Sequence, residues 1–307
     1  MKRKISIVEI YSHHTYVETM ATICMTLGYE VTIACTDHVK ENLSIFLKKN
    51  SETVSCITPN KNEKDIFFLQ RIKNHFDSNN FEYIFINTIQ GWAILKFFFF
   101  LPKTPIILSN GRLSEWFGVS YKLTGFNSFR DFFYHNYAHF FIKKLKNRYS
   151  KMIFHTPEAQ KFAYANGFNG ASCILPFSLY ANTNKPANVE KLKFVVTGLI
   201  AEKNRDFLGL LDALSKIKEK YFNLFSITIL TKEVKNKYGH KVKIKIEDLK
   251  KLGIDIKSYD SWITEKEYFL ESSQADLFIG PIKYSNYYAC GELTSTIVES
   301  VRHGRPG

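Results

Sequence analysis

The sequence predicts an α/β protein of two domains, each with a parallel sheet covered by helices on both faces. Three observations support this. The chain has 307 residues, about twice the length of a typical domain. Short, nearly continuous apolar runs alternate with longer amphipathic ones, which is typical of buried parallel strands and their crossover helices. The alternation stops at a polar, Pro-containing linker, 182–191, and then begins again.

The first predicted domain covers residues 1–181. Runs rich in Val, Ile, Phe and Tyr predict its strands at 4–10, 29–35, 53–58, 81–87, 105–109, 151–156 and 171–177. Amphipathic stretches predict helices at 16–28, 39–49, 66–76, 129–150 and 157–167. The helix at 129–150 is aromatic and basic; we favour a core helix with an exposed basic stripe, and a helix on a membrane surface is the alternative.

The second predicted domain covers residues 192–307 and repeats the alternation. Its strands are predicted at 192–198, 225–231, 254–260 and 276–282. Its helices are predicted at 205–220, around 244–253, at 264–275 and at 294–304.

Charge and cysteine content limit the classes of partner and compartment. The formal net charge of +13 favours anionic partners, which include nucleic acid, acidic lipid headgroups and phosphorylated small molecules. A solvated Lys-rich surface is the alternative. The 5 cysteines form no CxxC pair, which argues against a zinc site or a disulfide framework and favours a reducing cytoplasm. The N-terminus lacks the apolar core of a signal peptide.

Several nucleotide-binding and metal motifs are missing from the sequence. No GxGxxG follows the first strand and no GxxxxGK[ST] occurs, which disfavours a dinucleotide dehydrogenase and a P-loop enzyme. No Asp-x-Asp pair and no tight His/Asp/Glu cluster is present. We therefore expect neither a bound cofactor nor a catalytic metal.

Two groups of residues in the second domain suit a nucleotide. Gly198 ends a strand, with Lys203 and Arg205 before the next helix, so cations and a helix N-terminus could bind a diphosphate there. Thr294 is a plausible N-cap that would present Ser295 and free N–H groups to an anion, with Glu299 one turn further on for ribose hydroxyls. An ordinary strand-to-helix loop and a capped surface helix are the alternatives.

These residues resemble the group-4-like branch of the GT-B glycosyltransferases, of the bacterial surface-glycan type. The matching motifs are Gly198 followed by Glu202-Lys203 and a helix, the stretch ADLFIGP at 275–281, and a Glu-Ala-x-x-x-Gly-x-Pro pattern. The last is matched by Glu299, Ser300 at the Ala position, Gly304 and Pro306. The resemblance implies two Rossmann-like domains, with the donor bound mainly by the second and the acceptor mainly by the first. In such proteins the Gly-x-Pro turn leads into a further strand and helices, so we expect this sequence to be a piece of a longer one.

The resemblance also implies roles for individual residues on the donor side. Lys203 would contact the donor diphosphate and Glu299 the ribose, with Thr294 and Ser295 in the phosphate-facing loop. The Arg that often follows the strand Gly is Leu199 here, so Arg205 would supply the second cation.

The acceptor side is less specific. His14, with His13 and Glu18, follows the first strand and could contact the acceptor or transfer a proton, and a polar helix-capping loop is the alternative. The His that often contacts the transferred sugar is absent from 109–117. Asn110, Arg112 and Glu115 stand in that stretch, and we take Arg112 and Glu115 with His14 as the candidate catalytic residues.

The implied function is a cytoplasmic glycosyltransferase that moves a sugar from a nucleoside-diphosphate donor to a surface glycan, such as lipopolysaccharide or capsule, or to its lipid-linked precursor. A nucleotide-sugar epimerase and a catalytically silent subunit are the alternatives. The net charge is the only observation that supports nucleic-acid binding, so we do not expect it. The charge also suggests peripheral contact with the inner membrane face, an expectation that fails if the full-length protein does not bind anionic vesicles at low salt.

Overall fold

The computed structural model describes residues 3–11, 13–88, 97, 100, 102–109, 151–175, 191–202, 204–232, 236–261, 263–283, 291 and 293–307. The chain divides into two compact units: unit 1 is Met1–Phe177 with Cys290–Glu292, and unit 2 is Ser178–Ala289 with Leu293–Gly307. The helix predicted at 129–150 and residues 182–190 of the predicted linker lie outside the described residues.

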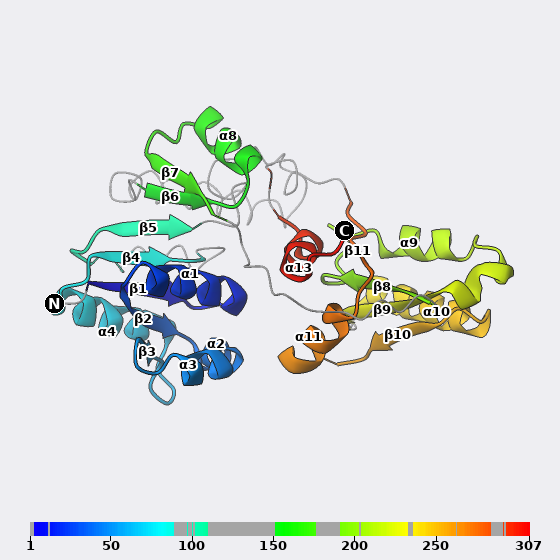
Figure 1. Cartoon of the computed structure of the whole chain (residues 1–307), viewed down its shortest axis with the longest axis horizontal. Helices are drawn as coiled ribbons and strands as arrows, with labels where there is room; N and C mark the ends of the chain where they lie inside the picture. Colours follow the sequence, from blue (N-terminus) through cyan, green and yellow to red (C-terminus); the bar gives the residue numbers. More distant parts are fainter. Residues whose placement is uncertain are drawn as a thin grey trace. The chain divides into compact units, whose positions relative to one another are not determined.

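Unit 1 contains a 7-stranded parallel sheet in the order β3-β2-β1-β4-β5-β6-β7 (Figure 1). Its strands are β1 (Lys4–Glu9), β2 (Glu30–Cys35), β3 (Val54–Ile57), β4 (Tyr83–Ile86), β5 (Ile106–Ser109), β6 (Lys151–Phe154) and β7 (Ala171–Ile174). Every pairing between neighbours is parallel, as the apolar runs predicted. β1 lies inside the sheet, because the chain first builds β2 and β3 on one side of it and then β4 to β7 on the other.

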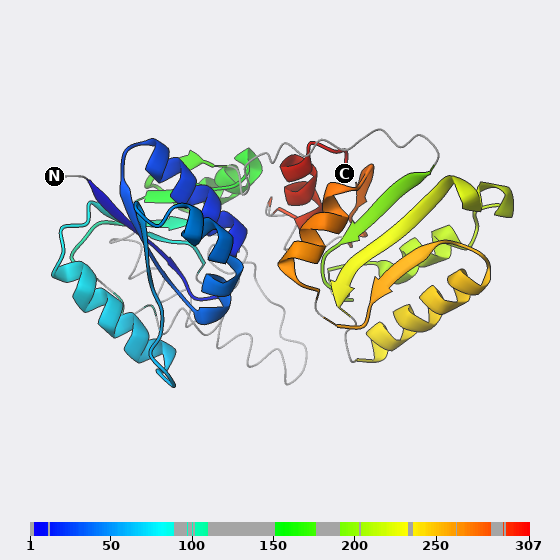
Figure 2. The same cartoon turned by 60° about the horizontal axis from the view of Figure 1, so that its bottom comes forward.

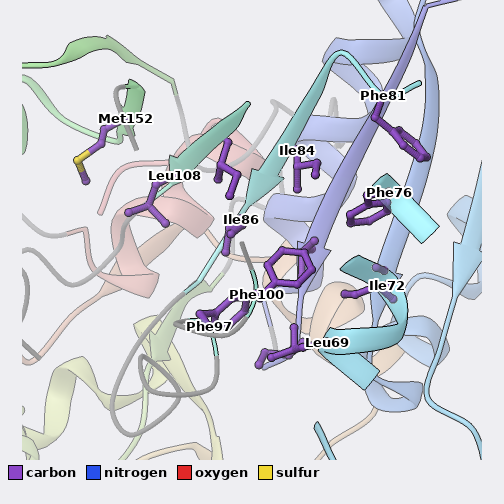
Figure 3. Packing of buried hydrophobic residues seen from close by; sticks show 14 of the residues in the cluster. Leu69, Ile72, Phe76, Phe81, Ile84, Ile86, Phe97, Phe100, Leu108 and Met152 are labelled. Carbon is purple, nitrogen blue, oxygen red and sulfur yellow. The ribbon is translucent and has the colours of Figure 1, made fainter. Parts of the chain in front are cut away.

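Helices cover both faces of this sheet (Figure 2). α1 (His14–Thr26), α2 (Asp37–Asn42) and α3 (Ser44–Lys49) bury apolar side chains in one core, which includes Ile7, Ile33, Tyr16 and Val17. α4 (Asp65–Asp77) and α8 (Pro157–Ala165) supply a second core. In that core Phe76 makes edge contacts with Phe81 and Phe100 (Figure 3). Neighbouring residues of a strand point to opposite faces, so β1 contributes Ile7 to one core and Val8 to the other.

Unit 2 contains a 4-stranded parallel sheet in the order β10-β9-β8-β11. Its elements are β8 (Leu192–Thr197), α9 (Phe207–Leu214), a 3₁₀-helix (Glu219–Leu224), β9 (Phe225–Lys232), α10 (Lys237–Lys251), β10 (Ile256–Tyr259), α11 (Glu265–Ser273), β11 (Leu277–Ile279) and α13 (Ser295–His303). One face packs on α9 and α10 and the other on α11 and α13 (Figure 2). Val196 and Val195 point into the first and second of these cores. After α13 the chain turns at Gly304, and the Pro306 carbonyl accepts a hydrogen bond from Phe278 N of β11 (2.9 Å).

Three predicted helices were wrong in extent. The helix predicted around 244–253 is α10, which begins earlier, at Lys237, where the Asn236 side chain caps it. The run 39–49 forms α2 and α3, separated at Leu43 (φ −89°, ψ 2°), because the flanking Asn42 and Ser44 favour turn conformations over a helix interior. The helix predicted at 205–220 spans only α9, since Asp206 caps its start and the Lys-rich residues after Ser215 are mostly exposed and give it no apolar face to bury. Within the described part of the chain, no helix has the length and apolar character needed to cross a bilayer.

Candidate functional site

The candidate donor site lies where the strand order of unit 2 reverses. From β8 the chain places β9 and β10 on one side and then returns to place β11 on the other. Loops that follow two such neighbouring strands diverge above the sheet, and ligands of open α/β sheets bind at this point. Here the two loops are tied together, because Asp206 N donates to Pro281 O (2.8 Å) and Lys283 N donates to Asn204 O (3.1 Å).

Gly198 and Arg205 form the floor of this site. Gly198 follows β8 with φ +100°, a conformation that L side chains rarely adopt. The Arg205 guanidinium packs directly on it, so a Cβ at position 198 would lie 2.7 Å from Arg205 Nη2. Arg205 is only 6% exposed, and its Nη2 donates to Ser295 Oγ (3.3 Å). The predicted second cation therefore lies between the β8 loop and the start of α13, where it raises the positive potential at that helix end.

The N-terminus of α13 points toward the same strand ends. Thr294 caps the helix, as predicted, by accepting a hydrogen bond from Ile297 N (3.3 Å). Thr296 lies 3.0 Å from Thr197 of β8, oxygen to oxygen, and it packs so closely on Gly280 of the β11 loop that a Cβ there would lie 2.5 Å from its hydroxyl. The first turn of α13, which includes Ser295, is thus held above β8 and β11 (Figure 1). The N–H groups and the dipole at a helix N-terminus attract anions, which agrees with the predicted phosphate-facing position of this turn.

Glu299 lies one turn further along α13 and is only 7% exposed. Its Oε2 is 3.3 Å from Nε2 of His303, which is also buried. Among the described residues, no hydrogen bond to Glu299 Oε2 satisfies normal geometry. Because a buried carboxylate is costly without donors, a ligand that offers hydroxyl groups here would be stabilised.

A depression in unit 2 adjoins this site at the carboxyl ends of β9 and β10. The enclosed space in it is about 30 Å³, and the rest of the depression is open to solvent. Its lining is mixed apolar and polar and includes Ile200, Thr231, Gly239, Val242, Ser258 and Tyr259. Ile200 belongs to the loop after β8, so this depression and the floor of the site share one loop.

Tyr238 braces that loop from α10. Its hydroxyl donates to Arg205 O (3.1 Å) and accepts from Phe207 N (3.0 Å), and the side chain is buried. Burial is the main reason that its pKa is raised, which keeps the hydroxyl protonated and able to donate.

Tyr238→Phe should therefore loosen the loop without a large cavity. We expect unit 2 to lose about 1 kcal/mol of stability, the usual cost of a buried hydrogen bond whose partner is left unsatisfied. Differential scanning calorimetry of the variant measures this. Tyr221→Phe is the control, since Tyr221 is exposed (44%) and should change the melting temperature little. Equal melting temperatures for wild type and Tyr238→Phe would contradict the bracing role.

The strand order of unit 1 reverses between β1 and β4, and sequence reasoning missed the residue at that point. Glu9 ends β1 and is fully buried. It accepts hydrogen bonds from Tyr11 N (2.6 Å), Asn87 Nδ2 (2.6 Å) and Thr88 Oγ1 (2.9 Å). Desolvation raises its pKa to about 7, although these donors and the charge of His14 act in the opposite direction. An acidic residue at the end of the otherwise apolar strand KISIVE was the available signal.

The remaining predicted acceptor-side residues are only partly described. His14 is the first residue of α1, close enough to Glu9 to influence its pKa electrostatically. Next to the β5 end, His155 Nε2 lies 3.5 Å from Ser109 Oγ and its Nδ1 lies 3.1 Å from Leu175 O. Burial lowers the pKa of His155 to about 4, so this imidazole is neutral. Lys203, Asn110, Arg112 and Glu115 lie outside the described residues, and their roles stay predictions.

No family model and no curated protein matches the sequence, whereas solved structures do match the fold. The crystal structure of Anabaena HepE, in complex with UDP and glucose, aligns with a TM-score of 0.65 at 11% identity and covers 99% of this chain and 79% of that one. AviGT4, a glycosyltransferase of avilamycin A biosynthesis, gives 0.52 at 11% identity over 99% and 78%. A putative UDP-N-acetylglucosamine 2-epimerase from Listeria monocytogenes gives 0.52 at 11% over 91% and 74%. The chain therefore has a two-domain, Rossmann-like GT-B fold, which confirms the predicted fold.

Proposed function

We propose that this GT-B-fold chain is a glycosyltransferase that moves a sugar from a nucleoside-diphosphate donor to a surface glycan or a lipid-linked acceptor. One observation carries the proposal: at the strand reversal of unit 2, the N-terminus of α13, the Arg205 guanidinium and the buried Glu299 carboxylate occur together. Cationic groups bind phosphates, and a carboxylate accepts hydrogen bonds from hydroxyls. The two together suit a ligand in which a diol lies next to phosphates. The complex of HepE with UDP and glucose supports the same class of ligand.

Each part of the donor has a proposed partner. The diphosphate lies at the first turn of α13, near Ser295, with Lys203 as the first cation and Arg205 as the second. The ribose hydroxyls donate to Glu299. The base lies over the mouth of the depression, beside Ile200 and Tyr259.

The proposed chemistry uses the chain's own charges. As the bond between the sugar C1 and the diphosphate oxygen breaks, the leaving group gains negative charge, which the α13 N-terminus, Arg205 and Lys203 stabilise. The acceptor hydroxyl oxygen forms the new bond to C1 and transfers its proton to a base, for which His14 is the proposed group. His14, Arg112 and Glu115 remain the proposed catalytic residues on the acceptor side. Neither a metal nor a bound cofactor is part of this proposal.

Nucleotide binding tests the donor site directly. We expect isothermal titration of wild type with UDP, GDP and CDP to find one preferred nucleotide. Glu299→Ala should weaken it by about 10- to 100-fold, the cost of removing a charged hydrogen-bond acceptor, and Lys203→Ala should weaken it less. Glu219→Ala and Lys216→Ala are controls, because these residues are exposed in the same unit and carry the same charges.

Turnover then separates the candidate activities. With the matching nucleotide sugar, a transferase should release nucleoside diphosphate faster when a lipid extract containing acceptor is added. Release without acceptor would indicate an epimerase or a hydrolase. Absence of nucleotide binding in folded wild-type protein would contradict the enzyme proposal and favour a silent subunit.

A further inference from the structure

His303 and Glu299 form a buried pair on one face of α13. They are separated by one helical turn, with Nε2 of the imidazole 3.3 Å from Oε2 of the carboxylate. His303 is 2% exposed and Glu299 is 7% exposed. A histidine and a glutamate without a role would be expected on the surface in contact with water. Because both are buried here, an interaction is needed to explain it.

Two aromatic side chains hold the His303 ring. It is stacked on Phe278 of β11, with ring centroids 5.9 Å apart and planes at 25°. On another side it packs against Phe269 of α11, with centroids 5.3 Å apart and planes at 49°. Because these phenylalanines belong to two different elements, the imidazole plane is set by the packing of unit 2 and not only by the rotamer preference of a helical residue.

The held ring can orient the carboxylate. His303 Nε2 lies 3.3 Å from Glu299 Oε2, and although the two atoms are not aligned as a regular hydrogen bond, an N–H at Nε2 is close enough to attract the carboxylate. A Glu side chain has three rotatable bonds. A ligand that has to fix this side chain on binding loses affinity, because the side chain loses conformational entropy. A partner on one carboxylate oxygen lowers that cost and leaves the other oxygen to accept hydrogen bonds from a ligand.

We propose that His303 is a positioning residue, which holds the Glu299 carboxylate in the orientation that receives the two ribose hydroxyls of the donor. This rests on the proposed function, since it assumes that Glu299 binds a ribose. Residues that orient metal ligands from behind contribute about 10- to 100-fold to metal affinity, and we take the lower end of that range for a residue that orients a ribose-binding carboxylate.

A comparison of two ligands tests this role. UDP, GDP and CDP are titrated into wild type, and the nucleotide that binds is then paired with its 2′,3′-dideoxy analogue, which lacks both ribose hydroxyls. His303→Phe preserves the aromatic packing and removes the N–H, and His303→Gln restores an N–H donor without the ring. We expect His303→Phe to weaken the ribonucleotide about tenfold and the dideoxy analogue less than about twofold. His303→Gln should recover most of the loss.

The combination with Glu299→Ala completes the test. In that background His303→Phe should weaken the ribonucleotide no further, because the group it positions is gone. Equal weakening of both ligands would mean that His303 only supports the fold, and no weakening of either would show that it does not act on the site; both results overturn the proposal. If His303→Phe does not fold, His303→Met takes its place in the same comparison. Wild type that binds no nucleotide overturns the proposed function itself, and the positioning role with it.

Discussion

Gly198→Ala should destabilise unit 2 by about 2–3 kcal/mol and abolish measurable nucleotide binding. Two costs add at this position. A non-glycine residue at φ +100° pays at least the ~1–2 kcal/mol of a left-handed conformation. The new Cβ would also lie 2.7 Å from Arg205 Nη2 and 2.9 Å from Cζ, and because these atoms end a flexible side chain, the cost of overpacking is at the low end of its range, ~1 kcal/mol. Any relief moves the guanidinium away from Ser295, and this disrupts the proposed diphosphate site.

A matched control separates the two costs. Gly253 lies in the same unit at φ +92°, but a Cβ there would meet only Phe222 Cδ2 at 3.8 Å, an ordinary contact. Gly253→Ala should therefore show the backbone cost alone and leave nucleotide affinity unchanged. Urea denaturation measures stability for both variants, and calorimetric titration measures affinity. If the two substitutions cost the same, the packing of Arg205 on Gly198 is not the reason that glycine is needed.

Glu9→Gln should change how the stability of unit 1 depends on pH. The Glu9 pKa is raised from 4.5 to about 7 in the folded protein, so between these values the folded state holds a proton that the unfolded state has lost. Stability from this group is present below about pH 4.5 and is lost as pH rises through 7. The loss amounts to about 3 kcal/mol, at about 1.4 kcal/mol for each pH unit. Glutamine does not titrate, so the variant lacks this loss.

The measurement has to be a difference, because His155 titrates in the opposite sense. Its pKa is lowered to about 4, so its contribution to stability is lost as pH falls and partly offsets Glu9 between pH 4.5 and 6.5. We expect the unfolding free energy of wild type minus that of Glu9→Gln to fall by about 3 kcal/mol from pH 4.5 to 8. Glu41→Gln, on the exposed side of α2, should track wild type. A difference that is constant with pH would contradict the raised pKa.

The strands and several turns could be predicted because their signals are local. KISIVE, LKFVVT and the other apolar runs are buried whichever way the sheet is ordered, and all described strands lie within the predicted ranges or within one residue of them. Thr294 was recognised as an N-cap because the cap bonds a residue three positions away. The predicted length of α9 was too great. The helix ends where it no longer packs on apolar residues of other elements, and the periodicity of its own sequence does not contain that information.

The candidate site was predicted unevenly for the same reason. Gly198, Arg205, Thr294, Ser295 and Glu299 were named from motifs, and the structure places them around one strand reversal. The close packing of Arg205 against Ser295, 90 residues away, was not foreseen. Glu9 was missed entirely, because its raised pKa comes from burial and from partners as distant as Asn87, 78 residues along the chain.

By itself the sequence determined which segments are strands and helices, that the chain repeats one α/β pattern, and which residue types stand at the strand ends. These properties follow from side-chain periodicity and local hydrogen bonding over a few residues. Only the tertiary structure decided which strand ends are neighbours, and so which polar groups meet there. It also decided which of them lie buried, as Glu9, Arg205, Glu299 and His303 do. Desolvation and charge pairing depend on every atom nearby in space, and those atoms come from parts of the chain that no local pattern connects.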